Sequence, residues 1–124
     1  MRKAILALVI VGMLSVASVA SARIVIRLSY MHDQTARTAK GVANRLQDAN
    51  NYGVDRCRRF SNLRGKCIGV VYGASTDPAN PSAGPQPWTC KFIERFRVTR
   101  SLHVRKAIGA VQCSGPGSGF IQRH

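Results

Sequence analysis

The four cysteines of this 124-residue chain constrain its fold more than any other feature. They are Cys57, Cys67, Cys90 and Cys113, and four cysteines allow three different pairings. Residues that face each other across an antiparallel hairpin share a constant sum of residue numbers, so a hairpin can be tested for each pairing. Pairing Cys57 with Cys67 centres a tight turn on Asn62, inside a plausible turn sequence. The first two cysteines therefore predict one short disulfide-linked hairpin.

The last two cysteines predict a second, longer hairpin. Facing Cys90 with Cys113 places its turn between residues 101 and 102, and sets Phe92 against Val111 on one face. We therefore expect both disulfides to be local. The rival use of four cysteines is a zinc site, but none of them forms the closely spaced pair that structural zinc usually requires. We expect no metal and no cofactor.

An apolar N-terminal segment indicates export from the cytoplasm. Arg2 and Lys3 precede an apolar run that begins at Ala4, and residues 20–22 (Ala-Ser-Ala) match the small residues before a signal-peptidase site. We expect residues 1–22 to be a signal peptide and the mature chain to begin at Arg23. The alternative is a retained anchor, because an apolar stretch of about 17 residues is at the lower limit for crossing a bilayer. Disulfides persist in the oxidising compartments outside the cytoplasm, which agrees with a secreted or extracytoplasmic protein.

The sequence after the expected signal peptide predicts one α+β domain over residues 23–113. One N-terminal helix should pack on a mainly antiparallel sheet of 4–5 strands. Alternating apolar residues predict a strand over Arg23–Tyr30. A helix should follow over Gln34–Asn50, with Asp33 as its N-cap and Gly53 just beyond its end. The second half should supply three strands, Cys67–Tyr72, Trp88–Thr99 and Val104–Cys113. Four prolines make Gly73–Pro87 an irregular loop, and residues 114–124 should form a flexible Gly-rich tail.

Basic residues dominate the charge of the chain, which carries 19 Lys and Arg against 5 Asp and Glu. Without Arg2 and Lys3, seventeen basic residues remain against five acidic ones, a net charge near +12. Such an excess attracts anionic partners such as nucleic acid, envelope polymers or lipid headgroups. The alternative is a compositional bias toward arginine, with the side chains simply solvated.

Two groups of basic residues are the candidates for binding anions. One surrounds the first hairpin, and the other alternates along the outward face of the second, where Arg97 should lie opposite Lys106. Like charges directly across a strand pair are destabilising, so a bound anion would relieve them. The same register places Arg105 opposite Val98 on the buried face, unless a bulge near residues 105–107 corrects it. The complete candidate set is Arg56, Arg58, Arg59, Arg64, Lys66, Lys91, Arg95, Arg97 and Lys106.

The sequence favours a non-catalytic protein that binds an anionic surface or polymer, and two alternatives stay open. Glu94 lies on the expected buried face and His103 near the hairpin turn, so together they could serve a small secreted nuclease. The second alternative is an inhibitor or other partner-binding module that presents the Pro-rich loop 74–88 to a protein partner.

Overall fold

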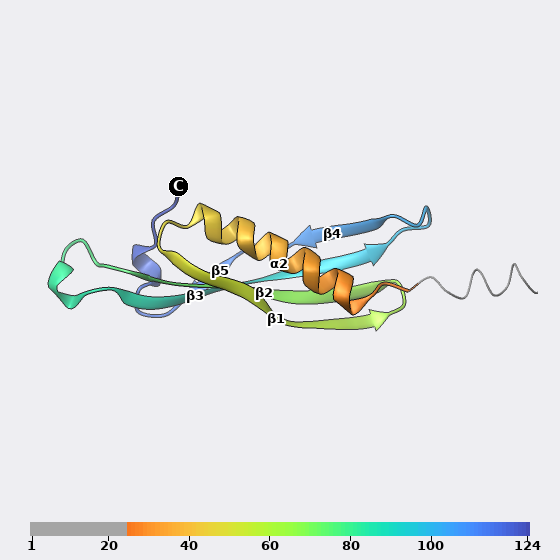
Figure 1. Ribbon diagram of the computed structural model, residues 1–124, viewed down its shortest axis with the longest axis horizontal. Coiled ribbons are helices and arrows are strands. Elements are labelled where there is room, and N and C mark those ends of the chain that lie inside the picture. The colour runs from red at the N-terminus through yellow and green to blue at the C-terminus, as the bar shows by residue number, and fades with distance from the viewer. Residues whose placement is uncertain (1–24) are drawn as a thin grey trace, which may run out of the picture.

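The computed structural model describes residues 25–124, in which one helix packs on an antiparallel sheet (Figure 1). The sheet order is β1-β2-β3-β4, and β5 also pairs with β3. The expected α+β class and both expected disulfides, Cys57–Cys67 and Cys90–Cys113, are confirmed. The expected signal peptide, residues 1–22, and Arg23 lie outside the described residues. The elements are α2 (Leu28–Arg45), β1 (Ala49–Ser61), β2 (Arg64–Ser75), η1 (Pro81–Ala83), β3 (Gln86–Val98), β4 (Val104–Ile108), β5 (Gln112–Ser114) and η2 (Ser118–Phe120).

The N-terminal part of the prediction was wrong in its boundaries. Residues 25–27 have no regular structure and Leu28–Tyr30 form the first turn of α2, so no strand covers this part of the expected Arg23–Tyr30 segment. The buried residues Met31, Thr35 and Ala39 recur every four positions, and this helical period overrides the short alternation before them. Asp33 therefore lies inside the helix rather than at its N-cap.

The helix also ends earlier than expected. It stops at Arg45, Leu46 is extended, and β1 already begins at Ala49. Gly53 accordingly lies within β1 and takes no part in ending the helix. Residues 49–56 lack the alternation of apolar and polar residues that predicts a strand. They form part of β1 because they pair with β2.

The β1–β2 hairpin has the register that the first disulfide predicts. Cys57 faces Cys67, and the turn lies at residues 62–63 between Ser61 and Arg64. Strands β2 and β3 then pair over twelve positions without interruption, from Arg64↔Arg97 to Ser75↔Gln86. Both strands extend beyond the expected Cys67–Tyr72 and Trp88–Thr99 segments at their loop-side ends, so the irregular loop shrinks to residues 76–85.

The expected strand Val104–Cys113 is broken into β4 and β5. Cys90 faces Cys113 as expected, but Phe96 faces Lys106 instead of Ala107, a slip of one residue. The slip occurs at residues 109–111, where the backbone N–H of Gly109 donates to the Ile93 carbonyl at 2.8 Å. It does not lie near residues 105–107, where a bulge would also have corrected the expected register. Because side chains alternate along a strand, the slip exchanges the faces of the basic residues in β4.

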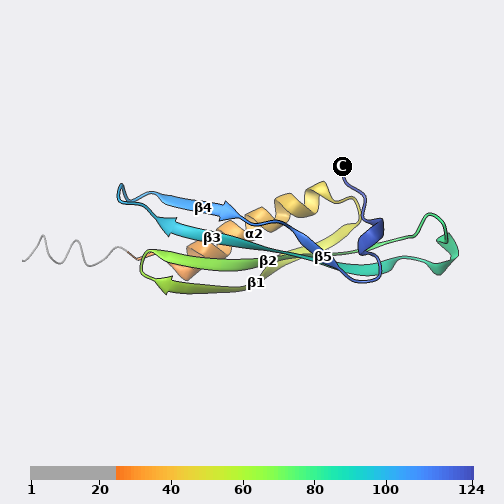
Figure 2. The same cartoon turned by 180° about the vertical axis from the view of Figure 1, so that it is seen from behind.

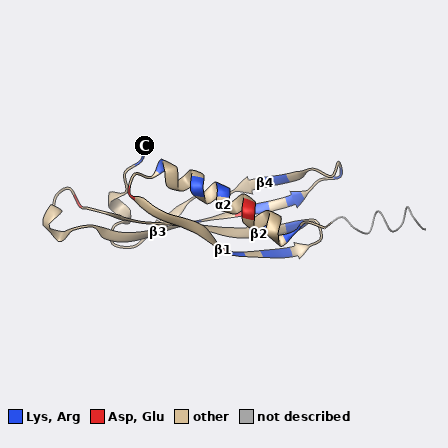
Figure 3. Ribbon diagram, viewed as in Figure 1, with Lys and Arg blue, Asp and Glu red and all other residues tan. Residues whose placement is uncertain are grey.

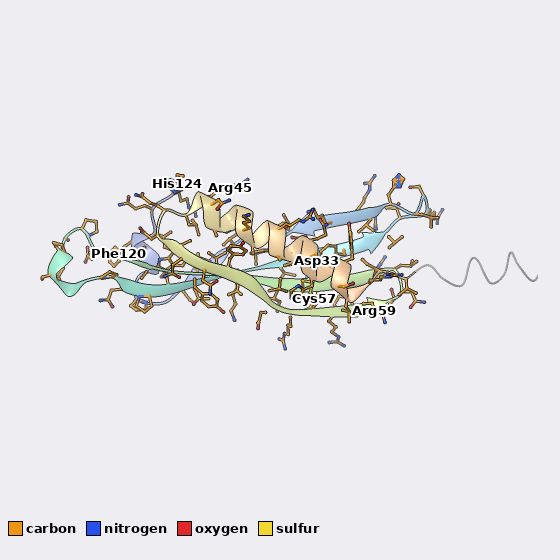
Figure 4. The ribbon with its side chains drawn as sticks, viewed as in Figure 1. Asp33, Arg45, Cys57, Arg59, Phe120 and His124 are labelled. Carbon is orange, nitrogen blue, oxygen red and sulfur yellow. A yellow bond between two sulfur atoms is a disulfide. The ribbon has the colours of Figure 1, made fainter. Side chains whose placement is uncertain are left out.

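The C-terminal segment, expected to be flexible, is held against the end of α2 and the connection between α2 and β1. The backbone N–H of Gln47 donates to the Gln122 carbonyl at 2.9 Å, and that of His124 donates to the Arg45 carbonyl at 2.9 Å. His124 and Arg45 lie side by side in Figure 4. Ile121 packs against the apolar core beneath the helix. Residues 118–120 form the short helix η2 rather than a frayed end.

The apolar core between helix and sheet has two clusters, one toward each end of the molecule. The first contains Ile26, Met31, Cys67 and Phe96, and the second contains Leu46, Val71, Trp88 and Cys90. Two glycines of β2 let aromatic rings lie directly on the strand: a Cβ at Gly69 would collide with the ring of Phe92, and one at Gly73 with that of Trp88. We call the end with the β1–β2 turn and the β3–β4 hairpin the arginine end, and the end around Trp88 and the C-terminal segment the tryptophan end.

Candidate anion-binding face

The face of the sheet turned away from α2, seen in Figure 2, carries two rows of cations at the arginine end. Three neighbouring strands place Arg58, Lys66 and Arg95 in register across the sheet. The next row toward the turn is formed by Arg64, Arg97 and Arg105, on β2, β3 and β4. In Figure 3 the basic residues of the sheet gather at these strand ends, while the tryptophan end carries few.

Strand alternation explains why these side chains share one face. On β3 the residues Phe92, Glu94 and Phe96 are buried toward the helix, whereas Arg95 and Arg97, on either side of Phe96, are exposed. On β2 the buried Gly65 and Cys67 alternate in the same way with the outward Arg64 and Lys66. The period of two in a strand thus sorts apolar residues inward and cations outward.

The spacing of the rows follows from sheet geometry. Neighbouring strands lie about 4.8 Å apart, and residues two apart along one strand are separated by roughly 6.7 Å. Six cations therefore occupy a small lattice, with like charges directly opposite each other, an arrangement that destabilises strand pairing. The only ion pair among residues 25–124 is between Lys106 and Glu94, so no carboxylate of this part of the chain compensates the rows.

A shallow depression of about 500 Å³ lies along the second row. Arg64, Arg95, Arg97 and Arg105 line it, together with the ring of Phe60. The Phe60 ring is half exposed, and both the Arg58 guanidinium carbon and the Lys66 Nζ lie 5.6 Å from its centre. These cation–π contacts hold the two basic side chains over the sheet rather than splayed into water.

Seven of the nine expected anion-binding residues lie on this open face. Two of the seven stand beside the rows: Arg56 opposite Ile68, and Lys91 further toward the tryptophan end, opposite Gln112. Arg59 faces the other side, where its Nη1 donates to the Ile26 carbonyl at 3.5 Å. The seven are Arg56, Arg58, Arg64, Lys66, Lys91, Arg95 and Arg97.

The expected position of Lys106 on this face was wrong, and Arg105 takes its place. Lys106 pairs with Phe96 on the helix side, where its Nζ lies 3.9 Å from Glu94 Oε1 and 3.4 Å from Gln34 Oε1. Arg105 faces Arg97 on the open face. The expected register had placed Arg105 against the apolar core, where an arginine does not fit, and this misfit was the one sign of an error in the sequence-based register. The position of the slip follows only from the observed strand pairing.

The two nuclease candidates do not form a site. Glu94 is fully buried beneath the helix, and no hydrogen bond to either carboxylate oxygen is present among the described residues. His103 lies in the turn of the β3–β4 hairpin, beyond the final pair Val98↔Val104. The register thus separates the two groups by several residue pairs along the hairpin.

The remaining expectations concern the loop, metals and membranes. Residues 76–85 project between β2 and β3 away from the arginine rows (Figure 1). Within this loop, Asp77 Oδ1 accepts a hydrogen bond from the Ala79 N–H, and Asn80 Oδ1 accepts one from Ser82 Oγ. Within residues 25–124, no three His, Cys, Asp or Glu side chains gather as metal ligands. In the same part of the chain, no helix is long and apolar enough to cross a membrane.

No family model, curated protein or solved structure matches this chain.

Proposed function

We propose that this protein is a secreted, non-catalytic domain that binds an anionic surface or polymer through the arginine rows on the open face of its sheet. The observation that carries the proposal is the register of Arg58–Lys66–Arg95 beside Arg64–Arg97–Arg105. Two hairpins that are separate in the sequence contribute to the same lattice of charge.

The chemistry of arginine suits this role. A guanidinium group presents a planar fork of donors that matches the oxygens of phosphate, sulfate or carboxylate, and it stays charged at all physiological pH values. A polyanion laid across the rows would contact several forks at once and would release bound counterions from its own charges. It would also neutralise the cross-strand repulsion that the protein bears when free.

Secretion is supported by the two disulfides and by the N-terminal sequence. Both crosslinks join residues that the sheet already places opposite each other. Such bonds persist in oxidising compartments, which fits export directed by residues 1–22.

Retention on immobilised heparin, single-stranded nucleic acid and cell-wall polymer across a salt gradient tests the proposal. The face variant Arg64→Gln/Arg97→Gln/Arg105→Gln removes three charges from the second row. The control variant Arg37→Gln/Lys40→Gln/Arg45→Gln removes three charges from exposed positions on α2. We expect the face variant to elute at lower salt than the control from the polymer that binds best. Its salt-dependence slope should fall by about one for each lost anion contact.

Two outcomes would contradict the proposal. If the face variant and the control elute together below the wild type, binding depends on net charge and not on the rows. If the wild type itself leaves all three supports at low salt, the arginine rows bind no polymer of these kinds.

A further inference from the structure

The arginine end also carries a patch of exposed apolar side chains. Val25, Tyr30, Leu102 and Val104 are 36–63% exposed and line one depression of about 370 Å³. We call these four residues the apolar tip. Leu63 in the neighbouring β1–β2 turn is exposed as well. Clustered apolar exposure of this kind marks an interaction site more often than scattered single residues do.

Leu102 occupies a backbone conformation that leucine disfavours. Its φ of 63° lies in the left-handed region, and it is the only non-glycine residue with positive φ among residues 25–124. It is also the most exposed large apolar residue described, at 63%. Gly or Asn would adopt this conformation at less cost, and a leucine that is 63% exposed returns little stability to the fold. The fold therefore gives no reason for a leucine here.

Hydrogen bonds hold the segments of the tip in place. The Ile26 N–H donates to the Asn62 carbonyl at 2.7 Å, and the Val98 N–H donates to the Leu63 carbonyl at 2.8 Å. Within the hairpin, the Leu102 N–H donates to the Thr99 carbonyl at 3.0 Å. The N-terminal segment, the β1–β2 turn and the β3–β4 hairpin thus present the apolar tip as one platform.

Arginines border this platform on several sides. Arg27 lines the depression, and Arg97 faces Arg105 immediately beside the pair Val98↔Val104. Arg100 lies in the same hairpin as Leu102. None of the acidic residues lines the depression. An apolar centre with a cationic border is the pattern of proteins that insert shallowly into a membrane of anionic lipids.

We propose that the apolar tip inserts into the interface of an anionic lipid bilayer, while the surrounding arginines bind lipid phosphates. The inference rests on the proposed function, because the arginine rows supply the electrostatic attraction, and it identifies the anionic surface as a membrane. A soluble polyanion would give the exposed Leu102 no apolar environment to enter, whereas the boundary between headgroups and acyl chains does.

Vesicle sedimentation with the chain lacking residues 1–22 tests the inference. One set of vesicles contains only phosphatidylcholine, and the other contains added phosphatidylglycerol. The wild type should bind the anionic vesicles and leave the neutral ones. Leu102→Asn should bind the anionic vesicles about tenfold or more weakly, because one buried leucine side chain is removed. The control Val111→Asn, which removes an exposed apolar residue outside the tip, should bind like the wild type.

Heparin retention and thermal unfolding of the same variants separate the possible failures. Leu102→Asn should elute from heparin like the wild type and should unfold at the same or a higher temperature, since Asn tolerates the left-handed conformation. If Leu102→Asn binds anionic vesicles as well as the wild type does, the membrane inference is overturned and the arginine rows are unaffected. If the wild type binds heparin but not anionic vesicles, the membrane inference is likewise overturned and the arginine rows are unaffected. If the wild type binds neither, the proposed function itself fails.

Discussion

The two ends of this molecule differ in whether their buried polar groups have hydrogen-bond partners. At the tryptophan end, Trp88 Nε1 donates to Ser75 Oγ at 2.9 Å, and Ser75 Oγ donates to Asp48 Oδ2 at 2.7 Å. The C-terminal segment covers the same region. Toward the arginine end, the buried Glu94 carboxylate and Thr35 Oγ1 have no hydrogen-bond partner among the described residues. Buried polar groups without partners cost stability, so this end is the less optimised one.

The contrast indicates a division of roles along the sheet. The tryptophan end closes an apolar core, and its part of the sheet carries few charged side chains. The arginine end keeps cross-strand repulsion, an exposed leucine and a left-handed backbone position, none of which helps the chain to fold. Features that a fold tolerates at a cost gather where a protein acts, and here they gather around the proposed binding face.

Removing the Trp88 ring should have the largest effect on stability. We expect Trp88→Ala to lower the free energy of unfolding by about 3–5 kcal/mol, because it leaves a cavity over Gly73 and removes the donor to Ser75. Phe60→Ala at the arginine end is the matched aromatic control, and should change the value by about 0.5 kcal/mol or less because its ring is half exposed. Denaturant unfolding followed by circular dichroism measures both. Equal losses would abolish the distinction between the two ends.

The disulfides should differ by the length of the loop that each closes. Chain entropy predicts a loss of roughly 3 kcal/mol for Cys→Ser pairs at either bridge, with the Cys90–Cys113 bridge worth about 0.7 kcal/mol more than Cys57–Cys67. Their sequence separations are 23 and 10 residues. The same unfolding experiment compares the two double variants, and reduction of the wild type provides the control. A larger loss at Cys57–Cys67 would place the greater share of crosslink stability at the arginine end.

The ion pair between Lys106 and the buried Glu94 should respond unequally to loss of its two members. Lys106→Met leaves the Glu94 carboxylate buried without a cation and should cost about 1–3 kcal/mol, whereas Glu94→Gln leaves a half-exposed lysine that water can solvate and should cost less. The double variant should recover part of the loss of Lys106→Met. Thermal unfolding at neutral pH decides the order. A greater loss for Glu94→Gln would mean that the carboxylate stabilises this end after all.

The candidate face was predictable in its parts but not in its assembly. The alternation around Phe92 and Phe96 already indicated that Arg95 and Arg97 point outward. That Arg64 and Lys66 lie beside them follows only from the pairing of β2 with β3, which joins the two hairpins. The exchange of Arg105 for Lys106 depends on a slip of one residue at 109–111 that no local preference specified.

By itself, the sequence determined the α+β class, both disulfides and the inward and outward faces of β3, because these follow from short-range spacing and from the period of two in a strand. Only the tertiary structure decided the start of the helix, the length of β1, the slip between β4 and β5 and the packing of the C-terminal segment. Each of these depends on partners distant in the sequence. Segments such as residues 49–56 and 118–124 have weak preferences of their own, so the elements they pack against determine their conformation.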